Sequence, residues 1–344
     1  METKVFLTIE WLNKKIHNYC NYGNVIGFSY TYHRRYVTDT YLLTIDFDYQ
    51  KQQKFFLKVY LPNLAHEIDT NKEVIFYNDF PKIMNNMAFV DCASCGYLEY
   101  TGLAYVLLKD MNETHYSRLN IRNCSKEDLL LFILKLAKIH AFWWDHKDLG
   151  VKVGKFLKKN AYVEYIDSLE QRFQIFQRKF EHKIDIAHFN AITLLIEHAD
   201  IFFDRLNSRS NITIIHGDAN PFGNVLFPKN PESDEVLLID WNAWGIQIGM
   251  KDVAHAIGLN FYPHQRKEFE DELLELYYKT LLEYGVCHYS YDDCLYDYKL
   301  CISTLLFSPV TLSSWDISEG VWWPYSVKGY ANYLDLNCQQ LIKK

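Results

Sequence analysis

A stretch near the middle of the chain, residues 212–252, contains three short apolar runs separated by polar loops. Asp218 follows the first run, Asn224 precedes the second and Asp240 follows the third. Short runs rich in β-branched residues and bounded by turn residues predict strands. We therefore expect three short strands whose ends bring these acid and amide side chains to one rim. Such an oxygen-rich cluster suits a hard cation such as magnesium.

The residues at these strand ends also form an ordered motif. His216-Gly217-Asp218 comes first, Asn224 follows, and Ile239-Asp240-Trp241 closes the third run. This order resembles the signature of the aminoglycoside phosphotransferase and choline kinase group of small-molecule kinases. In that group the Asn stands five residues after the Asp, where this chain has Gly223. The loop therefore carries one extra residue, which a glycine can absorb at little steric cost.

The resemblance implies a role for each motif residue. Asp218 would be the catalytic residue that accepts or orients the proton of the substrate hydroxyl, and Asn224 and Asp240 would hold Mg²⁺ on the nucleotide phosphates. His216 would support the catalytic loop by hydrogen bonding. Asp252, at the start of the next helix, would brace the same loop. A helix N-cap role explains Asp252 equally well, and both roles can hold together.

The chain has 344 residues, enough for two lobes and a large core. The resemblance implies an α+β architecture, the two-lobed protein-kinase-like fold. We expect a small N-terminal nucleotide-binding lobe with an antiparallel sheet (residues 1–107), a hinge (108–113), and a larger, mainly helical C-terminal lobe (114–344) with the catalytic loop and substrate pocket. Strand-like runs predict the sheet at 25–32, 40–47, 54–60, 96–100 and 103–108.

Lys58 lies in the middle of the third strand-like run, on one face with Phe56 and Tyr60. It resembles the kinase lysine that holds the α- and β-phosphates; a solvent-facing lysine on an edge strand is the alternative. Glu73, in the next predicted helix, would pair with Lys58, and Glu67 is the alternate partner. An acid early in a helix also favours the helix dipole without any such role.

The chain has no G-x-G-x-x-G loop to cover phosphates. The polar loop at 33–39 contains His33, Arg34 and Arg35, which either meet phosphate with their side chains or form a solvated tip. In the resembled fold the hinge binds adenine through backbone groups, which places that cofactor contact at Leu108, Lys109, Asp110 and Met111.

The rest of the chain reads as helices. Ser125 predicts the N-cap of a long helix with an apolar stripe. His140 lies on this stripe, where a core histidine that supports the catalytic loop is expected rather than a base. The segment 320–324 and the C-terminal segment 335–338 resemble ecdysteroid-kinase-like members of the group. Four tryptophans are candidates either for the walls of the substrate pocket or for the core: Trp241, Trp244, Trp322 and Trp323.

Composition limits the partners and the compartment. The net charge of −7 gives no basic footprint for nucleic acid. No run of 18 apolar residues predicts a membrane span, and the amphipathic segment 1–20 lacks a signal-peptide core, so a cytoplasmic location is expected. The eight cysteines, including the lone C-x-x-C at 92–95, lack a second ligand pair for zinc and are expected to be free thiols.

These features together predict an ATP- and Mg²⁺-dependent phosphotransferase that moves the γ-phosphate to a hydroxyl of a small molecule. A nucleotide-binding pseudokinase with a regulatory or scaffold role is the alternative, motivated by the missing glycine-rich loop and the shifted Asn224. Transfer of AMP on the same fold is a third reading. The substrate, the choice between ATP and GTP, and the oligomeric state are open at this point.

Overall fold

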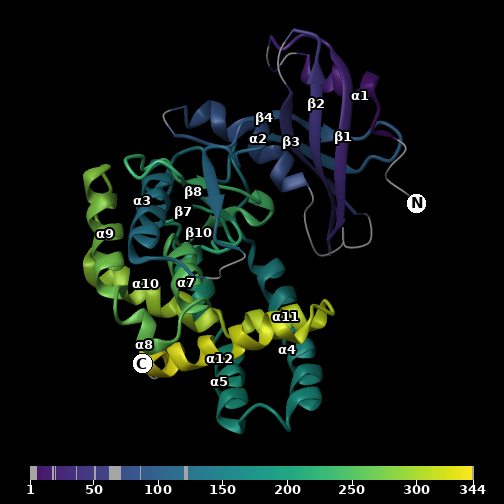
Figure 1. The fold of residues 1–344 in the computed structure, drawn as a ribbon. Helices are drawn as coiled ribbons and strands as arrows, with labels where there is room; N and C mark the ends of the chain where they lie inside the picture. The colour runs from purple at the N-terminus through teal and green to yellow at the C-terminus, as the bar shows by residue number, and fades with distance from the viewer. Residues whose placement is uncertain are drawn as a thin grey trace. The chain divides into compact units, whose positions relative to one another are not determined.

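The chain divides into two compact units in a computed structural model (Figure 1). Unit 1 comprises Met1–Asn120 and Asn224–Trp244, and unit 2 comprises Ile121–Gly223 and Gly245–Lys344. The segment from Asn224 to Trp244 belongs to unit 1 because it returns to pair with a strand of that unit, and the expected hinge at 108–113 stays a prediction. The structure describes residues 6–17, 19, 21–35, 37–49, 52–61, 71–85, 87–119 and 123–342.

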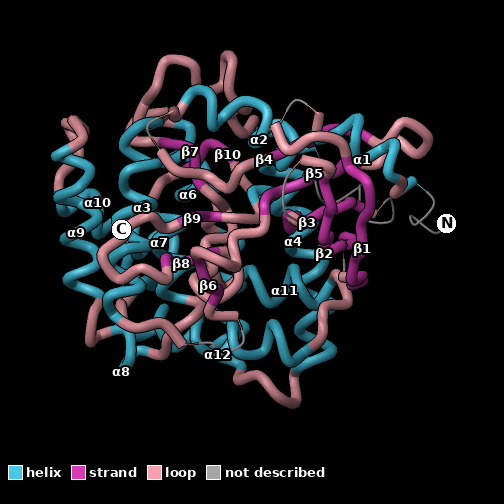
Figure 2. The backbone as a smooth tube through the Cα atoms, turned by 45° about the horizontal axis from the view of Figure 1, so that its top comes forward, coloured by secondary structure: helices cyan, strands magenta, loops and turns pink. Residues whose placement is uncertain are grey.

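Unit 1 contains the antiparallel sheet that the strand-like runs predict (Figure 2). Its strand order is β1-β2-β3-β5-β4, and every neighbouring pair is antiparallel. The polar loop predicted at 33–39 is shorter than expected, because its two strands extend as far as Arg34 and Thr38. The strands are β1 (Val25–Arg34), β2 (Thr38–Phe47), β3 (Gln53–Tyr60), β4 (Cys92–Tyr97) and β5 (Ala104–Lys109).

Helices α1 (Ile9–Ile16) and α2 (Asn71–Ile83) use opposite faces of this sheet. Leu12 of α1 joins a buried cluster with Leu57 and other β3 residues. Lys58 points to the other face, as the alternation along a strand requires, and α2 packs against β4 and β5. The alternate partner Glu67 lies outside the described residues.

The three strands of the motif stretch belong to two different sheets, one in each unit. The expectation that their ends share one rim stays a prediction. β7 (Thr213–Ile215) pairs with β10 (Gly245–Gln247) in unit 2. β8 (Val225–Pro228) instead pairs in unit 1 with β9 (Leu237–Leu238) and with β6 (His115–Ser117). The strand of Asp218 therefore shares no ladder with the strands beside Asn224 and Asp240. The reason is long-range pairing, which local composition does not encode.

Unit 2 is mainly helical, and α3 (Lys126–Trp143) is its central helix. Ser125 caps α3 in a reciprocal capping box with Asp128, as predicted from the sequence. The helix packs against β7, α7 and α9. Two of its helices, α5 and α6, follow each other directly and are separated by a break near His198. The remaining helices are α4 (Lys159–Phe180), α5 (Ile186–Glu197), α6 (Asp200–Asn207), α7 (Met250–Gly258), α8 (Pro263–Arg266), α9 (Glu270–Glu283), α10 (Tyr291–Thr304), α11 (Phe307–Ser314) and α12 (Glu319–Asp335).

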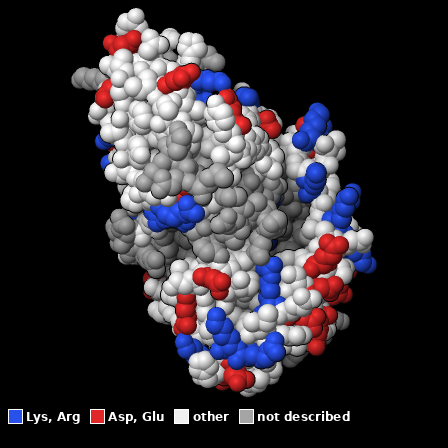
Figure 3. All heavy atoms as spheres, turned by 90° about the vertical axis from the view of Figure 1, so that its right-hand side faces the viewer, with Lys and Arg blue, Asp and Glu red and all other residues white. Residues whose placement is uncertain are grey.

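Two observations concern the partners expected from composition. Basic and acidic side chains both occur on the face of the molecule drawn in Figure 3. Among the described helices, none alone is long and apolar enough to cross a membrane, whereas α5 and α6, bent by 44°, reach that length and composition only as a pair. The absence of nucleic-acid and membrane partners stays a prediction.

Candidate active site

Unit 1 brings two carboxylates, those of Glu73 and Asp240, together around Lys58. The Lys58 Nζ atom lies 2.9 Å from Glu73 Oε2 and 2.5 Å from Asp240 Oδ1. The Lys58 and Glu73 side chains are only 8% and 1% exposed, whereas the Asp240 side chain is 37% exposed. The Tyr60 hydroxyl also donates to Glu73 Oε2, at 2.5 Å. A buried ammonium is therefore held between one buried and one accessible carboxylate.

The electrostatics of this cluster keep Lys58 charged. Burial alone would lower the pKa of the Lys58 ammonium, but the charges of Asp240 and Glu73 outweigh it and raise the pKa well above its ordinary value. Burial also raises the pKa of the Tyr60 hydroxyl, which keeps this group a neutral donor to Glu73. Lys58 is thus a fixed positive charge, which is the state that phosphate oxygens bind.

Contacts between α2 and the residues after Asp240 hold Glu73 and Asp240 near each other. Lys72 and Trp244 exchange hydrogen bonds: the Lys72 ammonium donates to the Trp244 carbonyl, and the Trp244 ring N–H donates to the Lys72 carbonyl. One turn along α2, the Phe76 ring stacks on Trp241 with centroids 3.9 Å apart. The first turn of α2, which contains Glu73, is therefore fixed to the segment that follows Asp240.

Asp240 itself has an unusual backbone. It lies at the end of β9 with φ 66° and ψ 55°, in the left-handed region that few residues other than glycine adopt. Asp tolerates this region better than most residues, and strained backbone of this kind concentrates at functional sites. The conformation ends the strand and starts the 3₁₀ turn Trp241–Ala243, while the carboxylate contacts Lys58.

Asn224 and Asp240 stand at the same end of the β8–β9 hairpin. Val225 pairs with Leu238, and the Ile239 N–H donates to the Asn224 carbonyl at 3.0 Å. Magnesium usually takes only one or two protein oxygen ligands and completes its shell with water and phosphate. In the described residues no group of three His, Cys, Asp or Glu side chains is placed to hold a metal alone. Asn224 and Asp240 supply the one or two oxygen ligands that such a shared ion requires, and magnesium binding here stays a prediction.

The predicted hinge leaves the sheet after β5, and part of its backbone is already bonded. The Lys109 N–H donates to the Asp91 carbonyl and the Asp110 N–H donates to the Lys54 carbonyl. Leu108 is paired within the sheet. Lys109 and Asp110 thus do not offer their N–H groups to adenine. Adenine binding by this segment stays a prediction, and Met111, which follows the last sheet hydrogen bond, is its best-placed residue.

The three basic residues considered for phosphate binding lie at the tip of β1 and β2, and their surroundings differ. His33 pairs with Thr40, which in turn pairs with Lys58, so these three residues form one row across the Lys58 face. Arg34 pairs instead with the fully buried Asp39 at 3.1 Å. His33 therefore shares the face of Lys58, whereas Arg34 is engaged by a buried carboxylate. Arg35 follows β1 and is exposed.

In unit 2 the motif loop after β7 is held by Asp252. Its two carboxylate oxygens accept the backbone N–H groups of His216, at 2.6 Å, and Gly217, at 2.9 Å. Burial alone would raise the pKa of the Asp252 carboxyl, but hydrogen bonding from His140 and from the loop more than offsets it, and the pKa is lowered. Asp252 lies inside α7, whose N-cap is Gly249, so the N-cap interpretation is wrong.

A buried polar chain supports Asp252 from behind. His140 is fully buried and contacts Asp252 Oδ2 through Nε2 at 3.2 Å and the Tyr277 hydroxyl through Nδ1 at 2.8 Å. The Thr213 hydroxyl donates to the His140 carbonyl, which connects β7 to α3. The expectation of a core histidine that supports the loop is confirmed. Both ring nitrogens are occupied, which excludes His140 as a free base.

Asp218, by contrast, is accessible. Its side chain is 48% exposed, and its Oδ1 atom lies 3.4 Å from His255 Nε2. The backbone of its loop is fixed by Asp252 and by the Asp218 N–H, which donates to His216 Nδ1 at 3.3 Å. A half-exposed carboxylate on a rigid loop is the arrangement that a general base requires.

Comparison with known families decides the identity. The family model described as "Ecdysteroid kinase-like family" matches residues 35–286, which include Lys58, Asp218 and Asp240. The chain belongs to the ecdysteroid kinase-like family. This family lies within the small-molecule kinases whose motif the sequence resembles. No curated protein matches the sequence.

Solved structures show that this ecdysteroid kinase-like protein has the aminoglycoside phosphotransferase and choline kinase fold. A putative aminoglycoside phosphotransferase from Ralstonia eutropha matches with a TM-score of 0.59 at 13% identity, covering 97% of each chain. Choline kinase LicA from Streptococcus pneumoniae matches with a TM-score of 0.54 at 15% identity, covering 96% of this chain and 98% of its own. An amicoumacin kinase in complex with AMP-PNP and Ca²⁺ has a TM-score of 0.54 at 12% identity, with 91% and 88% covered. At these identities the likeness establishes the fold alone.

Three of the four candidate tryptophans of this ecdysteroid kinase-like protein are core residues, which is the second of the two alternatives given for them. Trp241 and Trp244 are 1% and 4% exposed and pack against Phe76 and Phe80. Trp322 is 2% exposed and packs against phenylalanines of α4. Trp323 is half-buried. Large rings lose the most by exposure, so packing explains the first three without a ligand.

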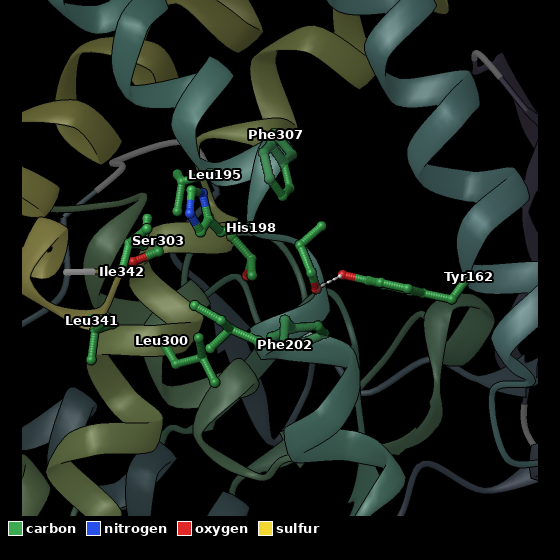
Figure 4. A pocket seen from close by; sticks show the side chains of 12 residues that line it. Tyr162, Leu195, His198, Phe202, Leu300, Ser303, Phe307, Leu341 and Ile342 are labelled. Carbon is green, nitrogen blue, oxygen red and sulfur yellow. Dashed lines mark hydrogen bonds between the residues drawn. The ribbon is translucent and has the colours of Figure 1, made fainter. Parts of the chain in front are cut away.

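Unit 2 also contains a pocket between α4, α6, α10 and α11, lined mainly by apolar residues but also by His198 and Ser303 (Figure 4). The Tyr162 hydroxyl at its edge donates to the Ala199 carbonyl at 2.7 Å and is therefore already bonded. None of the motif residues lines this pocket.

The cysteines of the described residues, including Cys92 and Cys95, are free thiols as predicted.

Sequence reasoning gave no role in the site to three residues. Tyr60 shares Glu73 with Lys58, Tyr277 completes the support of His140, and His255 contacts Asp218. His255 had a readable signal, because it follows Asp252 by three residues and a helix places such residues on one face. Tyr277 comes from α9, and only the tertiary packing brings it to His140.

Proposed function

We propose that this member of the family transfers the γ-phosphate of ATP to a hydroxyl group of a small molecule. The observation that carries the proposal is the buried Lys58, held as a cation by Glu73 and Asp240. A buried ion pair of this kind is a poor way to stabilise a fold, because apolar residues of similar size do as well. Its value lies in presenting a fixed ammonium and an accessible carboxylate to phosphate and its cation.

The residues of this chain divide the work of phosphoryl transfer, which is mostly positioning and charge stabilisation. Lys58 binds phosphate oxygens, and Glu73 holds Lys58 in place. Asp218 takes the hydrogen bond of the acceptor hydroxyl and then its proton. Asn224 and Asp240 would hold magnesium, which when bound neutralises charge on the phosphates.

The acceptor is a compound with a hydroxyl group, and the names of the relatives suggest which classes of compound to test. An ecdysteroid, choline, ethanolamine and aminoglycosides each present an alcohol, and the names of the family and of the matched structures cover all four. The net charge of −7 suits a neutral or cationic acceptor better than an anionic one. These four compound classes form a rational panel.

A nucleotide-binding pseudokinase is the second candidate, and three observations favour it. The chain has no glycine-rich loop, Arg34 at the β1–β2 tip is engaged by Asp39, and Asn224 is shifted by one residue from the pattern of the resembled group. A protein of this class would bind ATP and transfer no phosphate. The two candidate functions therefore predict the same binding of ATP, but only the kinase predicts transfer of phosphate.

The test separates binding from turnover. Mg-ATP binding is measured by calorimetry, and ATP consumption is measured with 20-hydroxyecdysone, choline, ethanolamine and kanamycin as acceptors. We expect binding together with a product that is one phosphate heavier than its acceptor. Binding without consumption of ATP on any acceptor selects the pseudokinase. Absence of nucleotide binding contradicts both candidates.

A further inference from the structure

Strand β4 contains a bulge that places Cys92 and Cys95 on one face of the sheet. Residues three apart in a regular strand point to opposite faces. Here Cys92 pairs with Leu108 of β5, whereas Cys95 pairs with Val106, because the register shifts just after Cys92. Leu108 and Val106 are two apart in β5 and therefore share a face, as do the cysteines opposite them. The extra residue of the bulge thus brings two thiols of odd spacing to the same side.

The face that the two thiols share is the face of Lys58. Val106, opposite Cys95, pairs on its other side with Lys58 in β3. Helix α2 packs against β4 and β5, and the Cys95 thiol donates to the Val74 carbonyl of α2 at 3.7 Å. Val74 directly follows Glu73, the carboxylate that holds Lys58. The pair of thiols therefore contacts α2 at the turn that positions the lysine.

The two thiols are chemically unequal. The Cys92 thiol donates a hydrogen bond to the Cys95 sulfur, and this bond lowers the pKa of Cys95, with help from the nearby Lys82 ammonium, although burial opposes it. The same hydrogen bond, together with burial, raises the pKa of Cys92. Both side chains are half-buried, so small molecules reach them. Cys95 therefore has more of the reactive thiolate character, and Cys92 stays protonated beside it.

We propose that Cys92 and Cys95 are a modification site: a hydroperoxide oxidises Cys95, Cys92 closes a disulfide on it, and the closure loosens α2 beside Glu73. The Cys95 sulfur attacks the O–O bond of the peroxide, which leaves a sulfenic acid on Cys95 and releases water or an alcohol. The Cys92 sulfur then attacks the Cys95 sulfur. The S–S bond forms, the S–O bond breaks, and the hydroxyl leaves as water with the Cys92 proton. The two sulfurs lose two electrons, and the peroxide gains them.

The backbone allows this bond with a small movement. Two steps along an antiparallel strand cover about 6.8 Å, and the Cα atoms that a disulfide joins are roughly 4.4 to 6.8 Å apart. Closure therefore draws the bulge tighter, and it removes the hydrogen bond from Cys95 to Val74. The contacts of α2 with Trp241 and Trp244 remain, so the effect on Glu73 is a partial one.

Mass spectrometry of the wild-type chain tests the disulfide without any variant. The reduced protein is treated with a small excess of hydrogen peroxide, the remaining thiols are alkylated, and the tryptic peptide 83–109 is weighed. This peptide contains Cys92 and Cys95 and no other cysteine. We expect it to lose two hydrogen atoms and to regain them with dithiothreitol. A peptide in which both thiols are still alkylated after peroxide would overturn the proposal.

Single variants test the order of the two steps. Cys92→Ser keeps a hydroxyl donor beside Cys95 but cannot form the disulfide, so sulfenic acid on Cys95 should accumulate and react with dimedone. Cys95→Ser leaves only the thiol of raised pKa and should take up roughly tenfold less dimedone at the same dose of peroxide. Cys287→Ser, which removes an exposed cysteine, is the control and should form the disulfide as the wild type does. Equal labelling of Cys92→Ser and Cys95→Ser would overturn the assigned roles.

Hydrogen exchange of the reduced and the oxidised wild type tests the effect on α2. We expect the backbone amides of α2 to exchange about two- to tenfold faster after oxidation, the range for one lost hydrogen bond. The amides of α3, in the other unit, are the control and should not change. Unchanged exchange of α2 in fully oxidised protein would overturn the coupling. The Kd for Mg-ATP should rise by a similar factor, and a reduced chain that binds no Mg-ATP contradicts the function proposed above rather than the disulfide.

Discussion

The Nζ atom of Lys58 lies 2.9 Å from Oε2 of Glu73, with both side chains buried under the sheet of unit 1. The same carboxylate oxygen accepts the hydroxyl of Tyr60, so its two partners can be removed separately. Removing the two partners one at a time therefore separates two effects. The charge of Glu73 positions the phosphate-binding Lys58, whereas the Tyr60 hydrogen bond only satisfies a buried group.

Glu73→Gln keeps the shape of the side chain and removes its charge. We expect the KM for ATP to rise about tenfold, equivalent to ~1.4 kcal/mol, because Lys58 is then held by Asp240 alone. Steady-state kinetics over a range of ATP concentrations measure this change. Tyr60→Phe is the matched control and should change the KM less than threefold, since the ion pair remains. Equal effects of the two substitutions would argue that Glu73 has only a structural role.

Gly249 is required by close packing rather than by its backbone angles, since its φ is −58°. A Cβ atom there would lie 2.4 Å from the Tyr277 hydroxyl and 3.0 Å from His140 Nδ1. We expect Gly249→Ala to lower the free energy of unfolding by about 2 kcal/mol, as overpacking of a core does, and to lower kcat by displacing Asp252. Urea denaturation and kinetics check the two effects.

Gly245→Ala is the matched control, because a Cβ there meets no atom within 4 Å. It should leave both the unfolding free energy and kcat close to wild type. If Gly249→Ala were equally harmless, the chain from Tyr277 through His140 to Asp252 would not be as rigid as its burial indicates.

Trp241 provides a test of the core alternative for the candidate tryptophans. Because its ring is buried against Phe76, Trp241→Ala should lower the free energy of unfolding by about 3–5 kcal/mol. Trp323→Ala, at a half-buried ring, should cost clearly less. Denaturation curves of the two variants give the comparison. A Trp241 variant of normal stability with a strongly raised KM for the acceptor would restore Trp241 as a pocket wall.

The buried His188 ring predicts that the free energy of unfolding of unit 2 decreases at acid pH. Burial lowers the pKa of its ring to about 4 from an ordinary 6.5, and the ring stacks on Tyr330 with centroids 4.1 Å apart. Between those two pH values His188 binds a proton in the unfolded chain but not in the folded chain. The stability that the neutral ring provides is therefore complete above pH 6.5 and decreases by about 1.4 kcal/mol per unit as the pH falls toward 4.

His188→Phe keeps the stack and removes the titration, so its unfolding free energy should depend less on pH in this window. Urea midpoints at several pH values from 4 to 7 measure the difference. The exposed His198 gives the control substitution His198→Gln, which should keep the slope of wild type. A slope unchanged by His188→Phe would place the acid sensitivity elsewhere.

Local pattern predicted the elements whose signals are local. Alternation in β3 placed Lys58 and Tyr60 on one face, and the capping residue Ser125 marked the start of α3. The order of motif residues led to the right family. Each of these signals spans a few residues, within which hydrogen bonding and side-chain direction are set by neighbours in the chain.

Features that depend on distant partners were not predicted. Composition did not show that β7 would pair with β10 while β8 and β9 joined β6, which places the motif stretch in two units. Nor did composition show whether Trp241 lies in the core or in a pocket wall, because both places offer apolar surroundings. His255 gained its partner only through the packing of α7 against the motif loop.

The most direct test of the central claim is phosphoryl transfer by Asp218→Ala and Asp240→Ala beside the wild type, followed as labelled phosphate passing from ATP to the best acceptor of the panel. Loss of the base should lower kcat about 10²- to 10⁴-fold at an unchanged KM for ATP. Loss of Asp240 should lower kcat at least as much and weaken the dependence on magnesium. Turnover that survives both substitutions would contradict the assignment of these two carboxylates and the phosphotransfer site built on them.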